Sequence, residues 1–289
     1  MFDLVEAFHR PSSIREALRL LHAGGRRARI VAGGTDVVVR ADPEIRSLVD
    51  ITRLGLTYIK RSGGAWAIGA TTTMAQIEHS AALRALAGGI LVEAAKGCGS
   101  VQLRNMATLG GNLANASPAA DTAAPLLVLD AQVVVAGERS RRTLALADFF
   151  LKPGETALGK ALLVEILIPA PPRGARTAWS FQKLGRTESD ISVVNAAAGL
   201  QVDGKGVCKW CRIALGAVAP VPLRARAAEA LVTGRKLDGS LVEQAAAEAA
   251  REASPITDIR ATAEYRREMC RVLVKRALAE CAARAGCSL

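Results

Sequence analysis

The sequence predicts an α+β protein in three parts: an α/β unit over residues 1–56, a second α/β unit over residues 57–172, and a C-terminal unit of antiparallel strands and helices over residues 173–289. Three observations predict it. Helix-like and strand-like segments alternate in the first part, prolines and a glycine cluster between residues 169 and 174, and two long strand-like segments precede three helical ones. A chain of 289 residues also exceeds one minimal core.

The first part begins with a helix. Ser13 and Glu16 have the spacing of a capping box, an apolar stripe follows, and Gly24-Gly25 ends the segment. Residues 29–32 and 48–51 have strand-like composition. These elements predict a small βαβ-like unit.

The second part opens with a hairpin, residues 58–60 and 65–69, around Ser62-Gly63-Gly64. Helices are expected over 74–79, with Thr73 as the cap and Gln76 at N3, and over 91–95. A stretch rich in glycine and asparagine (97–121) then precedes a helix and strands at 132–136 and 162–168.

The third part follows Pro169, Pro171, Pro172 and Gly174, which mark a linker. Strands are expected over 192–202 and 207–215, joined by a turn at 203–206, and three helices close the chain.

Charge and hydropathy exclude two classes of protein. The formal charge is +11, but the basic residues are scattered and aromatic residues make up only 3%, which disfavours a nucleic-acid groove. A basic surface facing water or an acidic protein fits better. The longest apolar run, 123–136, falls short of about twenty residues, so no membrane span is expected. The N-terminus lacks the basic start of a signal peptide, which predicts a cytoplasmic protein.

Cysteines and histidines provide no obvious catalytic machinery. Cys208 and Cys211 have a C-x-x-C spacing without a second pair, and on a strand residues three apart point to opposite faces. Two buried thiols are therefore favoured over a metal or dithiol site. The three histidines share no triad or zinc spacing.

Two glycine pairs carry the functional signal: Val31-Ala-Gly-Gly-Thr-Asp36 and Thr108-Leu-Gly-Gly-Asn112. Paired glycines after a strand let successive N–H groups approach one anion. One such pair is more often a tight turn, but two together favour a bound dinucleotide. Asp121 could cap the next helix or bind a hydroxyl of such a ligand.

Two other common phosphate-binding motifs are absent or incomplete. No Gly-x-Gly-x-x-Gly opens a helix. Residues 154–160 match part of a P-loop, but Ala161 replaces the magnesium-binding hydroxyl and Pro153 stands where a core strand would end.

The first glycine pair and the segment Thr108-Leu-Gly-Gly-Asn-Leu-Ala-Asn-Ala-Ser-Pro-Ala-Ala-Asp121 resemble the medium, FAD-binding subunits of molybdenum hydroxylases. That family includes the flavoproteins of carbon monoxide dehydrogenase and bacterial xanthine dehydrogenase. The resemblance runs nearly end to end, through residues 163–169, 181–186, 190–191 and 214–220.

The resemblance implies two α/β FAD-binding subdomains of the PCMH/vanillyl-alcohol-oxidase-like kind, which clamp an extended FAD, and a C-terminal flavoprotein domain. The backbone of the two glycine pairs would hold the pyrophosphate. Thr108, Asn115 and Asp121 would bond cofactor hydroxyls or phosphates, Leu163 would pack near the rings, and Lys183 would lie near the isoalloxazine unless Gln182 takes that place. The full implied set is Ile30, Val31, Ala32, Gly33, Gly34, Thr35, Asp36, Leu103, Thr108, Gly110, Gly111, Asn112, Asn115, Asp121, Leu163 and Lys183.

The resemblance also implies partners. Molybdopterin would reside on a large subunit and [2Fe-2S] clusters on a small one, and electrons would reach this chain's flavin and pass to NAD, oxygen or a quinone. No histidine stands in the first glycine pair, so the FAD is expected to be non-covalent, and no cysteine-rich insertion indicates an extra cluster.

Two alternatives remain at this stage. A stand-alone FAD-dependent oxidoreductase of the same fold would show activity by itself on a small organic substrate. A basic, non-enzymatic binding module would bind nucleic acid without flavin and with strong salt sensitivity.

Overall fold

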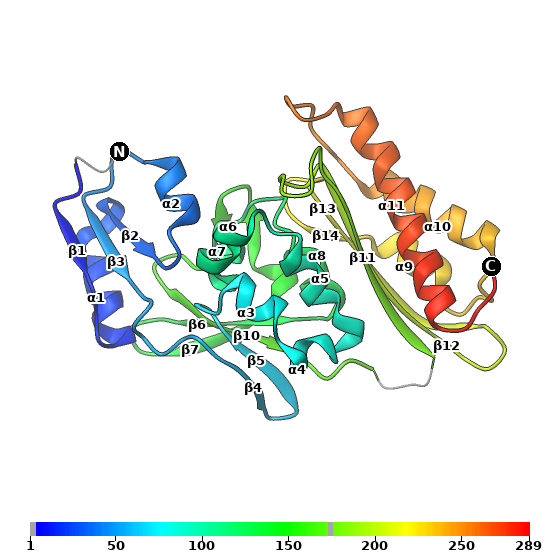
Figure 1. The fold of residues 1–289 in the computed structure, drawn as a ribbon, viewed down its shortest axis with the longest axis horizontal. Helices are drawn as coiled ribbons and strands as arrows, with labels where there is room; N and C mark the ends of the chain where they lie inside the picture. Colours follow the sequence, from blue (N-terminus) through cyan, green and yellow to red (C-terminus); the bar gives the residue numbers. More distant parts are fainter. Residues whose placement is uncertain (1–3, 173–175) are drawn as a thin grey trace.

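The computed structural model describes residues 4–172 and 176–289, so Gly174 of the expected linker lies outside the described ranges. Three larger β-sheets follow one another along the long axis of the molecule (Figure 1), and a separate two-stranded sheet accompanies them. The N-terminal sheet lies at one end, the middle sheet and its helices at the centre, and the C-terminal sheet with its helices at the other end.

The N-terminal sheet is parallel, in the order β1-β3-β2. Its elements are β1 (Ala7–His9), α1 (Ile14–Gly24), a 3₁₀ turn (Gly25–Arg27), β2 (Ala28–Val31), α2 (Thr35–Arg40) and β3 (Ser47–Asp50). The expected strands form one residue earlier than expected. Half of the expected capping box forms: the Ser13 hydroxyl accepts the Glu16 N–H, whereas the Glu16 carboxylate bonds Ser12.

The middle sheet is antiparallel, in the order β4-β5-β10-β6-β7. Its strands are β4 (Ile59–Ser62), β5 (Ala65–Gly69), β6 (Gln132–Ala136), β7 (Arg141–Ala145) and β10 (Leu162–Ile168), and β8 (Phe150–Lys152) pairs with β9 (Glu155–Thr156). The expected hairpin and the strands 132–136 and 162–168 are confirmed.

Helices fill the middle of the chain: α3 (Met74–Glu78), α4 (Ala81–Arg84), α5 (Ile90–Lys96), α6 (Val101–Met106), α7 (Leu109–Ala114) and α8 (Ala123–Val128), with 3₁₀ turns at Ala87–Gly89 and Leu146–Asp148. Thr73 and Gln76 form the expected capping box. The stretch 97–121 is not irregular, because Ser100 caps α6 and Thr108 caps α7.

The C-terminal sheet has the order β11-β12-β13-β14. It comprises β11 (Thr177–Leu184), β12 (Val194–Val202), β13 (Cys208–Gly216) and β14 (Leu223–Arg224), and is followed by α9 (Arg226–Val232), α10 (Gly239–Glu252) and α11 (Ala263–Arg284). The two expected strands and three closing helices are confirmed. Strand β11, whose two faces mix apolar and polar side chains, was not predicted from the sequence.

The expectation that Cys208 and Cys211 face opposite sides is wrong. Val202 pairs with Cys208 and Gln201 with Trp210, so β13 holds an extra residue at Lys209. This β-bulge brings both cysteines into one apolar cluster, while Trp210 packs on the other face of the sheet.

Three apolar clusters hold the sheets together. One joins α1 and β3 to one face of β6 and β10. A second lies between the other face of the middle sheet, the helices α3, α4, α5, α7 and α8, and the near face of the C-terminal sheet. The third fills the space between the C-terminal sheet and α9 to α11.

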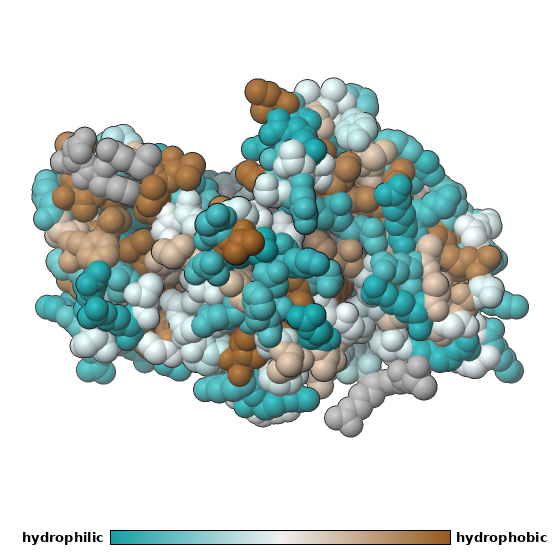
Figure 2. Space-filling model, in the orientation of Figure 1, coloured by the Kyte–Doolittle hydropathy of each residue, from teal (hydrophilic) through white to brown (hydrophobic). Residues whose placement is uncertain are grey.

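The surface in Figure 2 is largely hydrophilic, with apolar groups exposed near α2 and at the tip of the loop that joins α10 to α11. Among the described residues, no helix combines the length and the apolar character that crossing a bilayer requires.

Candidate functional site

A cavity of about 1150 Å³ lies between the N-terminal sheet and the helices of the middle part. Its walls come from the α1–α2 region, from α6 and α7, from the segment 154–163, and from Ser189 to Ile191 of the C-terminal part. Ligand cavities usually measure about 300–1000 Å³, so this one can hold a long ligand such as a dinucleotide.

The first glycine pair turns the chain from β2 into α2. Gly34 has a φ of 72° and is the N-cap of α2, a backbone conformation that favours glycine. A Cβ atom on Gly33 would lie 1.7 Å from the carbonyl oxygen of Met106. The turn after β2 therefore packs directly against the segment that precedes the second glycine pair.

The sequence predicted that the second glycine pair would form a loop after a strand, and this prediction is wrong. Gly110 and Gly111 belong to the first turn of α7, where the Thr108 hydroxyl accepts the Gly111 N–H at 3.1 Å. The Gly110 N–H bonds the Ala70 carbonyl at 2.9 Å, and a Cβ atom on Gly110 would lie 2.6 Å from that same oxygen. Gly110 thus lets α7 begin against the end of β5.

One hydrogen bond connects the segments that carry the two glycine pairs. The Asn115 amide donates to Asp36 Oδ1 at 2.8 Å, from the end of α7 to the start of α2. The side-chain Oδ1 of Asn112 accepts from the Thr122 hydroxyl at 2.5 Å, which anchors α7 to the start of α8.

The residues expected from the sequence largely gather at this cavity. All of them except Val31 and Lys183 line it: Ile30, Ala32, Gly33, Gly34, Thr35, Asp36, Leu103, Thr108, Gly110, Gly111, Asn112, Asn115, Asp121 and Leu163. The partial P-loop match at residues 154–160 also lines the cavity, but as a hairpin and the turn after it rather than a strand followed by a helix.

Asp121 sits at the end of the cavity nearest the C-terminal sheet. Its Oδ2 accepts from the Lys183 ammonium at 2.8 Å, and that ammonium also bonds the Gly97 carbonyl at 2.6 Å. Asp121 does not cap the following helix, because Thr122 is the N-cap of α8. Its carboxylate is instead directed toward β11.

Three further side chains surround the same carboxylate, and the sequence analysis did not find them. Ser192 donates to Asp121 Oδ1, Asn195 approaches it at 3.4 Å, and the Cys98 thiol lies 3.8 Å from Oδ2. A lone serine, asparagine or cysteine within an apolar segment gives no signal of such a role.

Burial raises the pKa of the Asp121 carboxyl, while Lys183 and the hydroxyl of Ser192 oppose the rise. Burial, followed by the nearby Asp121 charge, also raises the pKa of the Cys98 thiol. Cys98 is therefore a protonated donor and not a nucleophile at neutral pH.

Lys183 and Gln182 point to opposite faces of β11. Gln182 donates to Glu280 of α11 at 2.8 Å, whereas Lys183 faces Asp121 on the cavity side. Of the two residues, only Lys183 approaches the cavity wall.

Within residues 4–172 and 176–289, no group of three histidine, cysteine or acidic side chains could hold a metal ion.

Comparison with protein families gives two matches. The family model described as "FAD binding domain in molybdopterin dehydrogenase" matches residues 2–171, and "CO dehydrogenase flavoprotein C-terminal domain" matches residues 179–281.

Similar proteins cover almost the whole chain. The xanthine dehydrogenase FAD-binding subunit of Escherichia coli O157:H7 is 32% identical over 99% of both chains, and the carbon monoxide dehydrogenase medium chain of Hydrogenophaga pseudoflava is 34% identical over 94% of this chain and 95% of that one.

Among solved structures, carbon monoxide dehydrogenase from Hydrogenophaga pseudoflava superposes with a TM-score of 0.91, at 35% identity over 98% of this chain and 99% of that one. Quinoline 2-oxidoreductase from Pseudomonas putida 86 superposes with a TM-score of 0.88, at 28% identity over 96% and 98% of the two chains.

Proposed function

Because this chain belongs to the family of FAD-binding subunits of molybdenum hydroxylases, we propose that it holds one FAD, non-covalently, in the cavity between its N-terminal and middle parts. The observation that carries the proposal is the convergence of both glycine segments on one extended cavity. Gly33 and Gly110 let the segments that wall this cavity pack closely, because a Cβ atom on either residue would collide with backbone.

The glycine segments, residues 30–36 and 108–112, would hold the pyrophosphate. The Thr108 hydroxyl already accepts from Gly111, so its hydrogen can be donated to the cofactor. Asn115, tied to Asp36, would face the ribityl or phosphate groups. Leu103 and Leu163 would pack on the rings, and Lys183 with Asp121 would lie at the isoalloxazine end.

The chain would act as the electron-transfer subunit of a larger complex. A partner with molybdopterin would oxidise the substrate, a small [2Fe-2S] partner would deliver electrons, and NAD, oxygen or a quinone would accept them. When bound, FAD supplies the two-electron chemistry. The residues of this chain bind it and orient it, and we expect the complex to work in the cytoplasm.

We further propose that residues 1–56 and 57–172 act as the two subdomains that clamp FAD, and that residues 173–289 complete the cavity at one end. Ser189, Asp190 and Ile191 line that end.

An absorbance spectrum of the purified chain, with acid release of any chromophore, tests the proposal. We expect about one FAD per chain. A Gly111→Leu variant should lose most of this flavin while remaining folded, because Gly111 is exposed and its Cβ would meet only the Thr108 hydroxyl, at 2.9 Å.

Gly204→Leu is the matched control, since Gly204 lies in the β12–β13 turn with open space around it. A Gly111→Leu variant with full flavin contradicts the assignment of the glycine segment. A folded wild-type chain that refuses added FAD contradicts the proposed function itself.

A further inference from the structure

The Asp121 carboxylate is held largely by the C-terminal sheet. Its side chain is 7% exposed and that of Lys183 is 12% exposed. Ser192 and Asn195 approach Oδ1, while Lys183 and Cys98 approach Oδ2. Three of these four donors come from β11, from β12, and from the loop between them, so the sheet reaches directly to the cavity wall.

We propose that Ser192 and Asn195 are positioning residues for the isoalloxazine end of the cavity: by holding Oδ1 of Asp121, they turn Oδ2 toward Lys183 and keep a compensated ion pair beside the cofactor. This inference rests on the proposed FAD site and assigns a role to two residues that do not themselves line the cavity.

The geometry leaves Asn195 little freedom. Its side chain is packed against Gly216 on the neighbouring strand, where a Cβ atom would lie 2.4 Å from Asn195 Oδ1. That oxygen is buried without a hydrogen-bond partner, so the residue makes its polar contact through Nδ2, toward Asp121. An unpartnered buried oxygen is costly, and the close fit of this side chain against Gly216 holds it in place nevertheless.

The pair needs these donors because its surroundings disfavour a bare carboxylate. Burial raises the pKa of Asp121, and the hydroxyl of Ser192 works against that rise. The other titratable groups near the pair are Cys98, on the loop after α5, and Arg104 of α6, whose guanidinium is paired with Glu78 at 2.8 Å. Arg104 is therefore not available to replace Ser192.

Removing the Ser192 hydroxyl should let Asp121 take up a proton at a higher pH than in the wild type. Protonation would leave the Lys183 charge uncompensated beside the cofactor. An uncompensated cation favours the more negative, reduced flavin over the oxidised one. The variant should therefore prefer reduced FAD more strongly than the wild type does at low pH, and this difference should disappear as the pH rises.

The test measures the flavin midpoint potential between about pH 6 and pH 9 for the FAD-loaded chain and for Ser192→Ala, together with FAD affinity. We expect Ser192→Ala to prefer reduced FAD about tenfold more than the wild type at the acid end, equivalent to about 30 mV for a two-electron couple. The two profiles should meet at the alkaline end.

Two further variants serve as controls. Ser192→Thr keeps a hydroxyl and should restore the wild-type profile. Ser180→Ala removes another buried serine, one on β11 that bonds Glu280 on the side of α11, and should leave the profile unchanged. If Ser192→Ala does not fold, Asn195→Ala carries the same test, with a smaller shift in the same direction.

The outcomes separate this inference from the function on which it rests. A wild-type chain that binds no FAD overturns both. A wild-type chain that binds FAD, with Ser192→Ala following the wild-type profile or with Ser180→Ala shifting as much as Ser192→Ala, overturns the positioning role alone.

Discussion

At Gly33, the first two parts of the chain pack so closely that there is no room for one more atom. The Met106 carbonyl oxygen occupies the place where a Cβ atom on Gly33 would lie, at 1.7 Å. The clash is with backbone, which cannot rotate away as a side chain can. A methyl group there must push the turn after β2 away from the segment that precedes α7.

Gly33→Ala should therefore lower the free energy of unfolding by about 1–3 kcal/mol, the range expected for overpacking. Gly204→Ala should change it by less than about 0.5 kcal/mol, since no atom lies within 4 Å of the added group. Urea unfolding of the two variants measures the difference. Equal stabilities of the two variants would show that the backbone at Gly33 can move aside without loss of stability.

Asp203 controls the turn between β12 and β13. Its Oδ1 accepts the N–H groups of Lys205 and Val207, and the Lys209 ammonium lies 2.9 Å from Oδ2. The Lys209 contact, followed by the Val207 N–H, lowers the pKa of Asp203 to about 2. A depressed pKa stabilises the folded state above the unfolded value and loses that effect as the pH falls.

Asp203→Asn keeps an acceptor for the turn but removes the charge. The wild type should have the higher melting temperature near neutral pH, and the gap should close as the pH falls from about 4 to about 2. Thermal unfolding of both proteins across that range checks the sign. A difference in melting temperature that stays constant down to pH 2 would show that the charge of Asp203 does not stabilise the fold.

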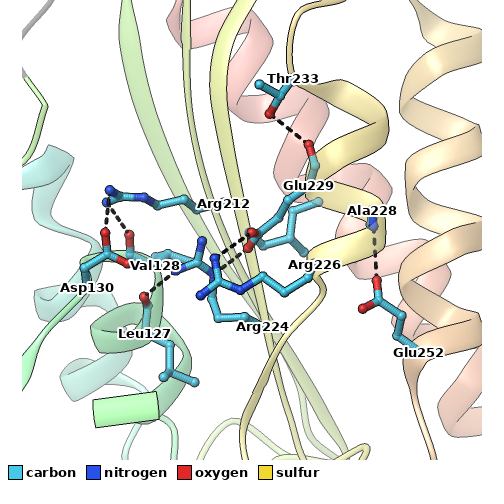
Figure 3. Close-up of polar contacts among 11 residues, drawn as sticks. Leu127, Val128, Asp130, Arg212, Arg224, Arg226, Ala228, Glu229, Thr233 and Glu252 are labelled. Atoms are coloured by element: carbon cyan, nitrogen blue, oxygen red, sulfur yellow. Dashed lines mark hydrogen bonds and ion pairs between the residues drawn. The ribbon is translucent and has the colours of Figure 1, made fainter. Parts of the chain in front are cut away.

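Among the elements, α8 shows how a helix end is fixed between two sheets. Its last carbonyls, from Leu127 and Val128, accept from Arg224 at 3.1 Å and Arg212 at 3.0 Å (Figure 3). Both arginines also pair with Asp130, directly after the helix. Cations at a helix C-terminus offset its partial negative charge, so this end is satisfied without water.

Arg224 also pairs with Glu229 of α9, which is 6% exposed and accepts the Ile213 N–H as well. Arg224→Ala would leave that buried carboxylate without its closest cation, and we expect a loss of about 3–5 kcal/mol in stability.

Arg226→Ala is the matched control, because Arg226 pairs with the same carboxylate from a side chain that is 66% exposed. Its loss should be at most about 1 kcal/mol. Guanidinium unfolding of both variants measures this contrast. Equal losses would mean that burial does not set the strength of these pairs.

For the whole molecule, the apolar clusters predict how the parts unfold. Trp179, Ala197 and Ala214 of the C-terminal sheet belong to the same cluster as the helices of the middle part. Separating the two parts would expose that cluster, at a cost of about 25 cal/mol for each Å² of apolar surface.

We therefore expect the middle and C-terminal parts to melt in one transition, with equal calorimetric and van't Hoff enthalpies. Differential scanning calorimetry of the wild-type chain measures both. Two resolved transitions in the wild type would show that the parts unfold independently. In that case Trp179→Ala should leave both transitions in place.

Local signals in the sequence determined the elements that depend on neighbouring residues. The hairpin at Ser62-Gly63-Gly64, the capping box of Thr73 and Gln76, and the strand 162–168 all follow from spacing within a few residues. The glycine pairs likewise identified the cavity wall, because few other residues suit such close approaches. The position of the second pair within α7 was not predicted.

Tertiary structure decided everything that depends on distant partners. Asp121 meets Lys183 across 62 positions and Ser192 across 71, and the extra residue in β13 brings Cys208 and Cys211 to one face. A pattern of residues records periodicity within one segment, whereas these contacts depend on how separate sheets pack. Spacing within single segments thus identified the glycine-rich part of the cavity wall, whereas packing between the sheets brought Asp121, Lys183 and Ser192 together.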